Sequence, residues 1–168
     1  MMAFFANVEQ TGLSLWVRES PSLWAFPFIL FLHTLGLAML AGLNVGLDAW
    51  LLGRRKLPPF ELANIYRVMW LGFGINALSG LVLLAAYPAK ALTNWVFFAK
   101  LMFIAIAVWV LQRLKGELAV AGGTVERDVT RRARHLALAS LVLWTATIFA
   151  GRLLAYTHHV LLVSEGLS

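Results

Sequence analysis

The sequence predicts an all-α, polytopic membrane protein: a four-helix bundle with a short N-terminal interfacial helix. Its 168 residues are 61% hydrophobic and 13% charged, with a mean hydropathy of +0.79, which is too apolar for an ordinary soluble domain. Four apolar runs have the roughly 20 residues that a helix needs to cross a bilayer. Basic residues gather in alternate segments between these runs, which is the topology signal of membrane proteins.

Residues 1–20 form the first predicted element, an interfacial segment ahead of a transmembrane domain at 21–168. The segment has no basic start and no small-residue cleavage site, so we do not interpret it as a signal peptide. Its apolar side chains indicate an amphipathic helix that lies in the membrane interface. Ser20 and Pro21 then predict the start of the first span, as an N-cap and a first-turn proline.

We expect the spans at about 23–47, 68–87, 94–112 and 136–162, each long enough for the hydrocarbon core. The segments after the first and third spans hold ten basic residues, against two on the other side. These are Arg54, Arg55, Lys56, Arg67, Arg113, Lys115, Arg127, Arg131, Arg132 and Arg134, against Arg18 and Lys90. The bias predicts that the basic segments lie in the cytoplasm and both termini outside, which for a bacterial inner membrane is the periplasm. Because the basic residues separate apolar runs and form no continuous stripe, we expect no nucleic-acid partner.

The first span carries three polar side chains, His33, Asn44 and Asp48. At about 100° per residue they fall within about 60° of one another on a regular α-helix, so we expect one polar stripe. Small residues occupy the opposite face: Ala38, Gly42, Gly46 and Ala49. Such a face lets another backbone approach closely and also allows self-association into a homo-oligomer. The pattern predicts a central helix that touches protein on two sides.

Most of the polar residues in the spans have a structural interpretation. We expect Asn44 and Asn76 to hydrogen-bond between helices, each bond contributing about 0.5 to 2 kcal/mol. Asp48, near the inner end of the first span, is expected to pair with an arginine of the first basic loop. Two further faces carry small and polar residues: Gly72, Asn76, Ser79 and Gly80 in the second span, and Ser140, Thr147, Gly151 and His158 in the fourth.

A candidate ligand-binding site lies in the outer half of the membrane. Counting along the spans at about 1.5 Å per residue places His33, Lys100 and Arg152 at a similar depth. No carboxylate lies at that level in any span. The basic groups therefore either snorkel toward the outer surface or bind an anionic partner, such as a lipid phosphate or a haem propionate. His158, nearer the outer mouth, is a further candidate.

Candidate metal ligands are limited to His33, His158 and His159, because the chain has no cysteine. A shared ion at the His158–His159 pair requires the helix to end there, since adjacent helical positions do not face each other. A b-type haem commonly takes two axial ligands, and His33 has no histidine at its own depth. The methionines available as a second ligand are Met39, Met69 and Met102.

No catalytic constellation is present in the sequence. It contains no nucleophile and base pair, no paired carboxylates, no glycine-rich phosphate loop and no HExxH motif. We therefore expect a protein that is not an enzyme.

The stretch WVRESPSLWAFPFILFLHTLGLAMLAGLNVGLDAWLLG carries a resemblance. An aromatic-proline pair is followed by a histidine, a glycine-rich stretch and an Asp-x-x-Leu-Leu-Gly ending, at Phe26-Pro27, His33, Gly36, Gly42, Asp48 and Leu51-Leu52-Gly53. This order resembles an uncharacterised family of four-helix bacterial inner-membrane proteins and implies their fold, without an activity. Two positions depart from the family pattern: Leu30 stands where a glutamate is frequent, and Trp50 where an arginine commonly follows the aspartate.

A second, more distant resemblance concerns LTNWVFFAKLMFIAIAVWVLQRLK. This segment is similar to the lysine-containing helix of CopD-type copper-resistance membrane proteins, with Lys100 at the matching place. The resemblance implies copper handling together with a small periplasmic protein partner.

Three classes of function stay open at this point. The leading one is non-enzymatic handling of a small ligand, copper among the candidates, at a periplasm-facing site around His33 with Lys100, Arg152 and His158. The second is a haem-b electron-transfer membrane protein. The third is an accessory subunit of a larger membrane complex, in which Asn44, Asp48 and Asn76 only hold helices together. Membrane lipids are expected partners in every case.

Overall fold

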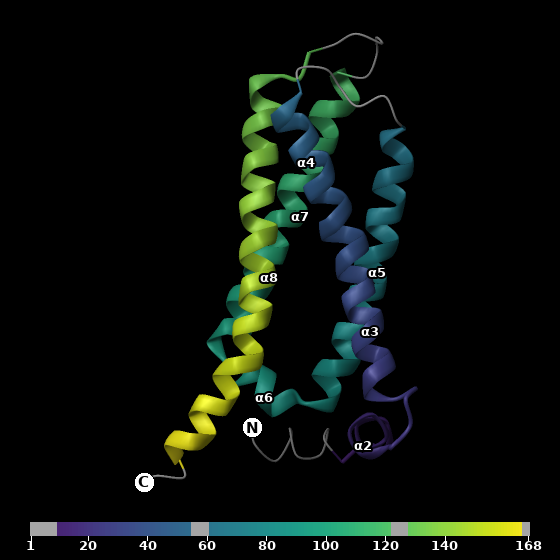
Figure 1. Cartoon of the computed structure of the whole chain (residues 1–168), viewed down its shortest axis with the longest axis vertical. Helices are drawn as coiled ribbons and strands as arrows, with labels where there is room; N and C mark the ends of the chain where they lie inside the picture. The colour runs from purple at the N-terminus through teal and green to yellow at the C-terminus, as the bar shows by residue number, and fades with distance from the viewer. Residues whose placement is uncertain (1–9, 55–60, 122–127, 166–168) are drawn as a thin grey trace.

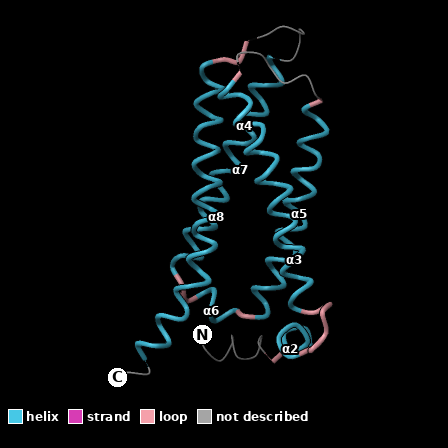
Figure 2. The backbone as a smooth tube through the Cα atoms, in the orientation of Figure 1, coloured by secondary structure: helices cyan, strands magenta, loops and turns pink. Residues whose placement is uncertain are grey.

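The computed structural model describes residues 10–54, 61–121 and 128–165. Throughout these ranges the regular elements are helices, without a strand (Figure 2). Four of the helical segments are long and apolar enough to cross a membrane: Phe26–Gly53, Leu62–Ala86, Trp95–Ala119 and Arg131–Leu154. The all-α, four-helix membrane bundle predicted from the sequence is therefore confirmed.

The elements follow one another as α2 (Gly12–Glu19), α3 (Phe26–Leu37), the π-helical turn η1 (Ala38–Gly42), α4 (Leu43–Gly53), α5 (Leu62–Ala86), α6 (Pro88–Leu92), α7 (Trp95–Ala121) and α8 (Arg131–Glu165). The helices of the spans extend past the predicted limits at the basic end of the bundle. The sequence estimate counted only the apolar residues, whereas backbone hydrogen bonding continues into the polar residues beyond them.

The helix α2 lies across the end of the bundle, where Figure 1 shows it nearly end-on. It buries Ser14 and Val17, and the Ser14 hydroxyl donates to the carbonyl of Ala86 at 3.3 Å. Leu15 and Trp16 are exposed. This amphipathic helix occupies the place where the sequence predicts an interfacial one; residues 1–9 of that segment lie outside the described residues.

The first span begins later than expected. The prediction from Ser20 and Pro21 is wrong, because α3 starts at Phe26 with Pro27 in its first turn. The Ser20 hydroxyl instead accepts a hydrogen bond from the backbone N–H of Ser22 at 3.3 Å. Serine side chains commonly form such local turns, and this bond keeps Ser20 in the connection between α2 and α3.

The helices α3 and α5 make backbone contact at Gly36 and Gly72. A Cβ atom added at Gly36 would lie 2.6 Å from the backbone nitrogen of Asn76 and 2.7 Å from the carbonyl oxygen of Gly72. One added at Gly72 would lie 2.7 Å from the Cβ of Met39. Only glycine fits at both positions, and small residues are what let membrane helices approach this closely.

The sequence predicts close helix contact at the face of Gly42 and Gly46, not at Gly36 and Gly72. Within a single chain that prediction is wrong. Gly42 and Gly46 are exposed, and a Cβ added at either would have no heavy atom within 4 Å. Ala38 and Ala49 on the same face are exposed as well. Self-association through this face stays a prediction.

The first span crosses the bundle obliquely, with α3 packed against α5 and α4 against α8 (Figure 1). The turn η1 joins the two halves. Because π-helical hydrogen bonds run from i to i+5, the turn inserts one residue and rotates the following face by about 100°. The single polar stripe predicted for a regular helix is thereby divided. His33 faces α5, whereas Asn44 faces α8.

The tightly packed core lies in the half of the bundle that carries the basic loops. Its buried cluster joins α4, the start of α5, the end of α7 and the start of α8. Leu51, Met69, Leu114 and Trp144 are among its fully buried side chains. His33 and Lys100 lie in the other half, where each is only half-buried.

Replacing Gly36 with alanine is expected to destabilise the bundle by about 2 kcal/mol, because the new methyl group overlaps the α5 backbone. The loss appears as a lower Tm of the protein purified in detergent. Gly46→Ala is the matched control, since no atom lies near that position, and it should leave the Tm unchanged or raise it slightly. Equal Tm values for the two variants would show that α3 and α5 are not in backbone contact.

Candidate functional site

The imidazole of His33 is held by α5. Its Nδ1 lies 3.0 Å from the carbonyl oxygen of Asn76 and 3.1 Å from the hydroxyl oxygen of Ser79. In return, the Asn76 side-chain amide donates to the carbonyl oxygen of His33 at 2.7 Å. The expected interhelical role of Asn76 is confirmed by this bond. The reciprocal pair fixes the position of His33 relative to α5.

These hydrogen bonds determine which ring nitrogen is available. A carbonyl oxygen can only accept, so Nδ1 carries a proton and donates it to Asn76. The Ser79 hydroxyl already donates to its own helix, at the carbonyl of Ile75. In the neutral imidazole the lone pair is therefore on Nε2, for which no hydrogen-bond partner exists among the described residues. Nε2 is the atom of His33 that can bind a ligand.

Gly80 provides the space in which the ring lies. A Cβ atom at this position would be 3.1 Å from Cε1 of His33. A larger side chain would have to displace the imidazole. Gly80 and Ser79 both contact the imidazole of His33, whereas the sequence assigned them only to a packing face together with Asn76.

Lys100 faces this region from α7. Its side chain packs over Gly151 of α8, where an added Cβ would be 3.7 Å from both Cε and Nζ. The lysine charge is close enough to act electrostatically on His33. Within the described part of the chain, Lys100 forms neither a hydrogen bond nor an ion pair. His33, packed against α5, and Lys100, packed against α8, therefore lie within electrostatic range of each other.

The other predicted ligand-binding residues are not joined to this pair. Arg152 is exposed on α8, and no described contact links it to His33 or Lys100. His158 and His159 belong to the backbone of α8, but their side chains lie outside the described residues. Because α8 continues through both residues to Glu165, the helix end that an ion shared by this pair would require is absent. Any separate part of Arg152, His158 or His159 in a ligand site stays a prediction.

A metal centre receives little support from the described residues. They contain no group of three or more histidine, cysteine or carboxylate side chains. Met69 is fully buried in the core, Met39 packs against Gly72, and Met102 is exposed. The ring nitrogen of His33 is the one ligand atom that the geometry presents, and the nearby charge of Lys100 repels a cation.

A second polar centre lies deeper in the bundle and joins α4 to α8. The Asn44 amide donates to a carboxylate oxygen of Asp48 at 2.9 Å and to the hydroxyl oxygen of Ser140 at 2.6 Å. All three side chains are fully buried. The interhelical role predicted for Asn44 is confirmed.

The predicted pairing of Asp48 with an arginine is wrong for the arginines that the structure describes. Asp48 is fully buried and forms no ion pair within the described ranges, whereas Arg54 lies over the ring of Trp50 at 5.3 Å. The inward orientation of α4 after η1 explains the difference, because it directs Asp48 toward α8. Arg55 and Lys56 of the same loop lie outside the described residues.

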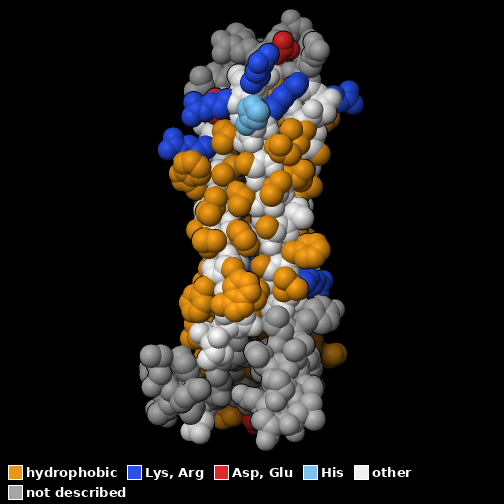
Figure 3. All heavy atoms as spheres, turned by 90° about the vertical axis from the view of Figure 1, so that its left-hand side faces the viewer, with side chains coloured by type: hydrophobic (Ala, Val, Ile, Leu, Met, Phe, Trp, Pro, Cys, Tyr) orange, Lys and Arg blue, Asp and Glu red, His pale blue; other side chains and the backbone are white. Residues whose placement is uncertain are grey.

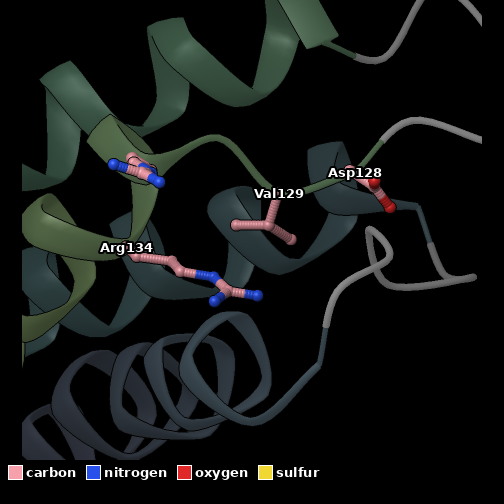
Figure 4. Close-up of a pocket in the computed structure, with 4 residues that line it drawn as sticks. Asp128, Val129 and Arg134 are labelled. Atoms are coloured by element: carbon pink, nitrogen blue, oxygen red, sulfur yellow. The ribbon is translucent and has the colours of Figure 1, made fainter.

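A shallow hollow of about 160 Å³ opens where α8 begins (Figure 4). It is lined by Asp128, Val129, Arg131 and Arg134. The Arg134 guanidinium donates to the carbonyl of Arg54 at 3.2 Å and so ties the end of α4 to α8. The hollow contains none of the predicted site residues.

Comparisons with models of protein families, with curated proteins and with solved structures find no match to this chain. The two resemblances noted from the sequence therefore stay predictions, and the function has to be argued from the residues themselves.

Proposed function

We propose that this multi-pass protein lies in a bacterial inner membrane with both termini in the periplasm, and that it binds a small ligand carrying an anionic group between His33 and Lys100. The observation that carries the proposal is the partly buried side chain of Lys100, which has no counter-ion among the described residues and whose charge acts on the oriented imidazole of His33. The protein acts by binding and not by catalysis.

The orientation follows from the charges at the two ends of the bundle. On the face shown in Figure 3, basic side chains gather beyond a band of hydrophobic ones, at the end where α8 begins. Seven of the described basic residues belong to this end: Arg54, Arg67, Arg113, Lys115, Arg131, Arg132 and Arg134. The positive-inside rule places such an end in the cytoplasm.

An anionic group is the ligand chemistry that fits the pair best. An ammonium group inside a membrane is costly unless it is paired, so a partner with negative charge stabilises it. Charge-assisted hydrogen bonds to phosphate or carboxylate oxygens are roughly twice as strong as neutral ones. His33 and Lys100 lie in the half of the bundle outside the tightly packed core, and both are only partly buried. A lipid headgroup or a free anion could therefore reach them.

This ligand class replaces copper, which the sequence interpretation placed first. Around His33 the described residues offer copper a single imidazole nitrogen, and the charge of Lys100 disfavours a further positive charge there. The same charge favours an anion, so the site around His33 is retained while its ligand changes.

Haem b is the second candidate, and one specific observation favours it. A metal-ligating histidine almost always donates its other ring N–H to a carbonyl or carboxylate, as Nδ1 of His33 does to Asn76. If the ligand is haem b, Nε2 of His33 would ligate the iron and Lys100 would pair with a propionate. The experiment on the ligand below separates the two candidates.

The orientation is tested by labelling with a membrane-impermeant maleimide, for which the cysteine-free chain is well suited. Single-cysteine variants at the exposed positions Thr93 and Arg131 are expressed in a bacterial host. In intact spheroplasts, T93C is expected to react and R131C to react only after lysis. The reverse pattern would contradict the proposed topology.

The ligand is tested with the full chain purified in detergent, by native mass spectrometry with phosphatidylglycerol as the probe. His33→Ala and Lys100→Ala are each expected to weaken binding about tenfold, as the loss of one charge-assisted contact predicts. Lys115→Ala is the control, because this exposed lysine lies at the other end of the bundle, over Tyr66.

Two further arms identify the source of the anionic group. Soluble dihexanoyl phosphatidylglycerol and inorganic phosphate are compared as competitors, and competition by phosphate alone indicates a free anion. Equal affinity in the wild type, both site variants and the control contradicts the proposal. A Soret band in the purified protein that His33→Ala abolishes would establish the haem candidate in its place.

A further inference from the structure

Several buried polar atoms in the basic half of the bundle, on Asp48 and its neighbours in α4, α5 and α8, have no hydrogen-bond partner in the part of the chain that the structure describes. Within the described residues, Oδ1 of Asp48, Oδ1 of Asn44, the hydroxyl of Tyr66 and Nε1 of Trp144 are buried without a hydrogen-bond partner. Asp48 and Asn44 are 0% exposed. Leaving one such group unpaired costs about 1 to 3 kcal/mol, and more if it is charged.

These atoms belong to one region of the bundle. Asn44 contacts both Asp48 and Ser140, and Trp144 follows Ser140 by one turn of α8. Tyr66 of α5 is close enough to Asp48 to interact with it electrostatically. Polar groups of α4 and α8 therefore meet at this carboxyl, and Tyr66 of α5 lies within electrostatic range of it.

We propose that Asp48, Asn44 and Ser140 bind a sodium ion inside the basic half of the bundle. A cation gives Asp48 the counter-charge that no described side chain supplies, and it also satisfies the unpaired oxygens of Asp48 and Asn44. A proton is the alternative to an ion. Carried on Oδ1 of Asp48 and donated to Oδ1 of Asn44, it would pair both oxygens and remove the charge, and this alternative predicts a Tm that follows pH. A water molecule could donate to both oxygens but would leave the carboxylate without a counter-charge.

The chemistry of the donors selects a monovalent, oxygen-preferring ion. The available donors are carboxylate, amide and hydroxyl oxygens, with no thiolate and no imidazole in the cluster. Calcium takes six to eight oxygen ligands and generally needs more negative charge than one carboxylate provides. A single carboxylate balances a single positive charge.

The helix geometry next to the cluster supports an ion site. The turn η1 ends at Gly42, immediately before the helix that carries Asn44. Single-turn π-helical segments inside α-helices occur frequently at functional sites. In membrane transporters, sodium sites are built where a spanning helix departs from regular α-helix.

The site is tested by measuring the Tm of the full chain in detergent while NaCl replaces choline chloride at constant ionic strength and fixed pH. Saturating sodium is expected to raise the Tm of the wild type by about 5 °C, as linkage predicts for a ligand that binds only the folded state. Asp48→Asn is expected to abolish the rise. Asp128→Asn, which alters an exposed carboxylate, is the matched control and should respond like the wild type.

Ser140→Ala keeps the carboxylate and provides a second test if Asp48→Asn does not fold. Loss of one oxygen ligand is expected to shift the sodium midpoint about tenfold upward. The proposal is overturned by an equal rise in Tm when KCl instead of NaCl replaces choline chloride, by an Asp48→Asn variant that still responds to sodium, or by a wild-type Tm that follows pH and not sodium.

Discussion

The backbone contact between Gly36 of α3 and Gly72 of α5 is the constraint on which the rest of the bundle depends. It brings the two helices so close that two hydrogen bonds form between them: the ring of His33 donates to the backbone carbonyl of Asn76, and the side-chain amide of Asn76 donates to the backbone carbonyl of His33. The next turn, η1, rotates the chain so that α4 leaves α5 and meets α8 through Asn44 and Ser140. The first span therefore packs against two helices: its α3 half against α5, because of this close approach, and its α4 half against α8, because of the turn η1.

The same geometry separates two polar centres by depth. His33 and Lys100 lie half-buried in the half of the bundle outside the packed cluster, away from the basic loops. Asp48, Asn44 and Ser140 are fully enclosed in the opposite half. Polar groups inside a membrane are retained at a free-energy cost and commonly mark sites. The difference in burial explains why we assign an exchangeable anionic ligand to the first centre and a small enclosed ion to the second.

The fold class was predictable from the sequence because it depends on the length and spacing of apolar runs, which bilayer thickness dictates. The interhelical roles of Asn44 and Asn76 were predictable for a related reason, since an amide in hydrocarbon seeks a partner. The partners themselves were not. A periodicity of 3.6 residues cannot reveal an inserted π-helical residue, so His33 and Asn44 were assigned to one face, and Asp48 was directed toward the loop. The glycine pair that makes the contact was also missed, because Gly42 and Gly46 match a small-xxx-small spacing whereas Gly36 and Gly72 belong to different spans.

The division of the first span into two faces is tested most directly by cross-linking pairs of cysteines introduced into the cysteine-free chain. The variants H33C/S79C and N44C/S140C replace side chains whose polar atoms lie 3.1 Å and 2.6 Å apart. With a short bifunctional thiol reagent applied to native membranes, both pairs are expected to cross-link to a similar extent. Cross-linking of H33C/S79C without that of N44C/S140C would contradict the account, because it would show that α4 does not turn from α5 to α8.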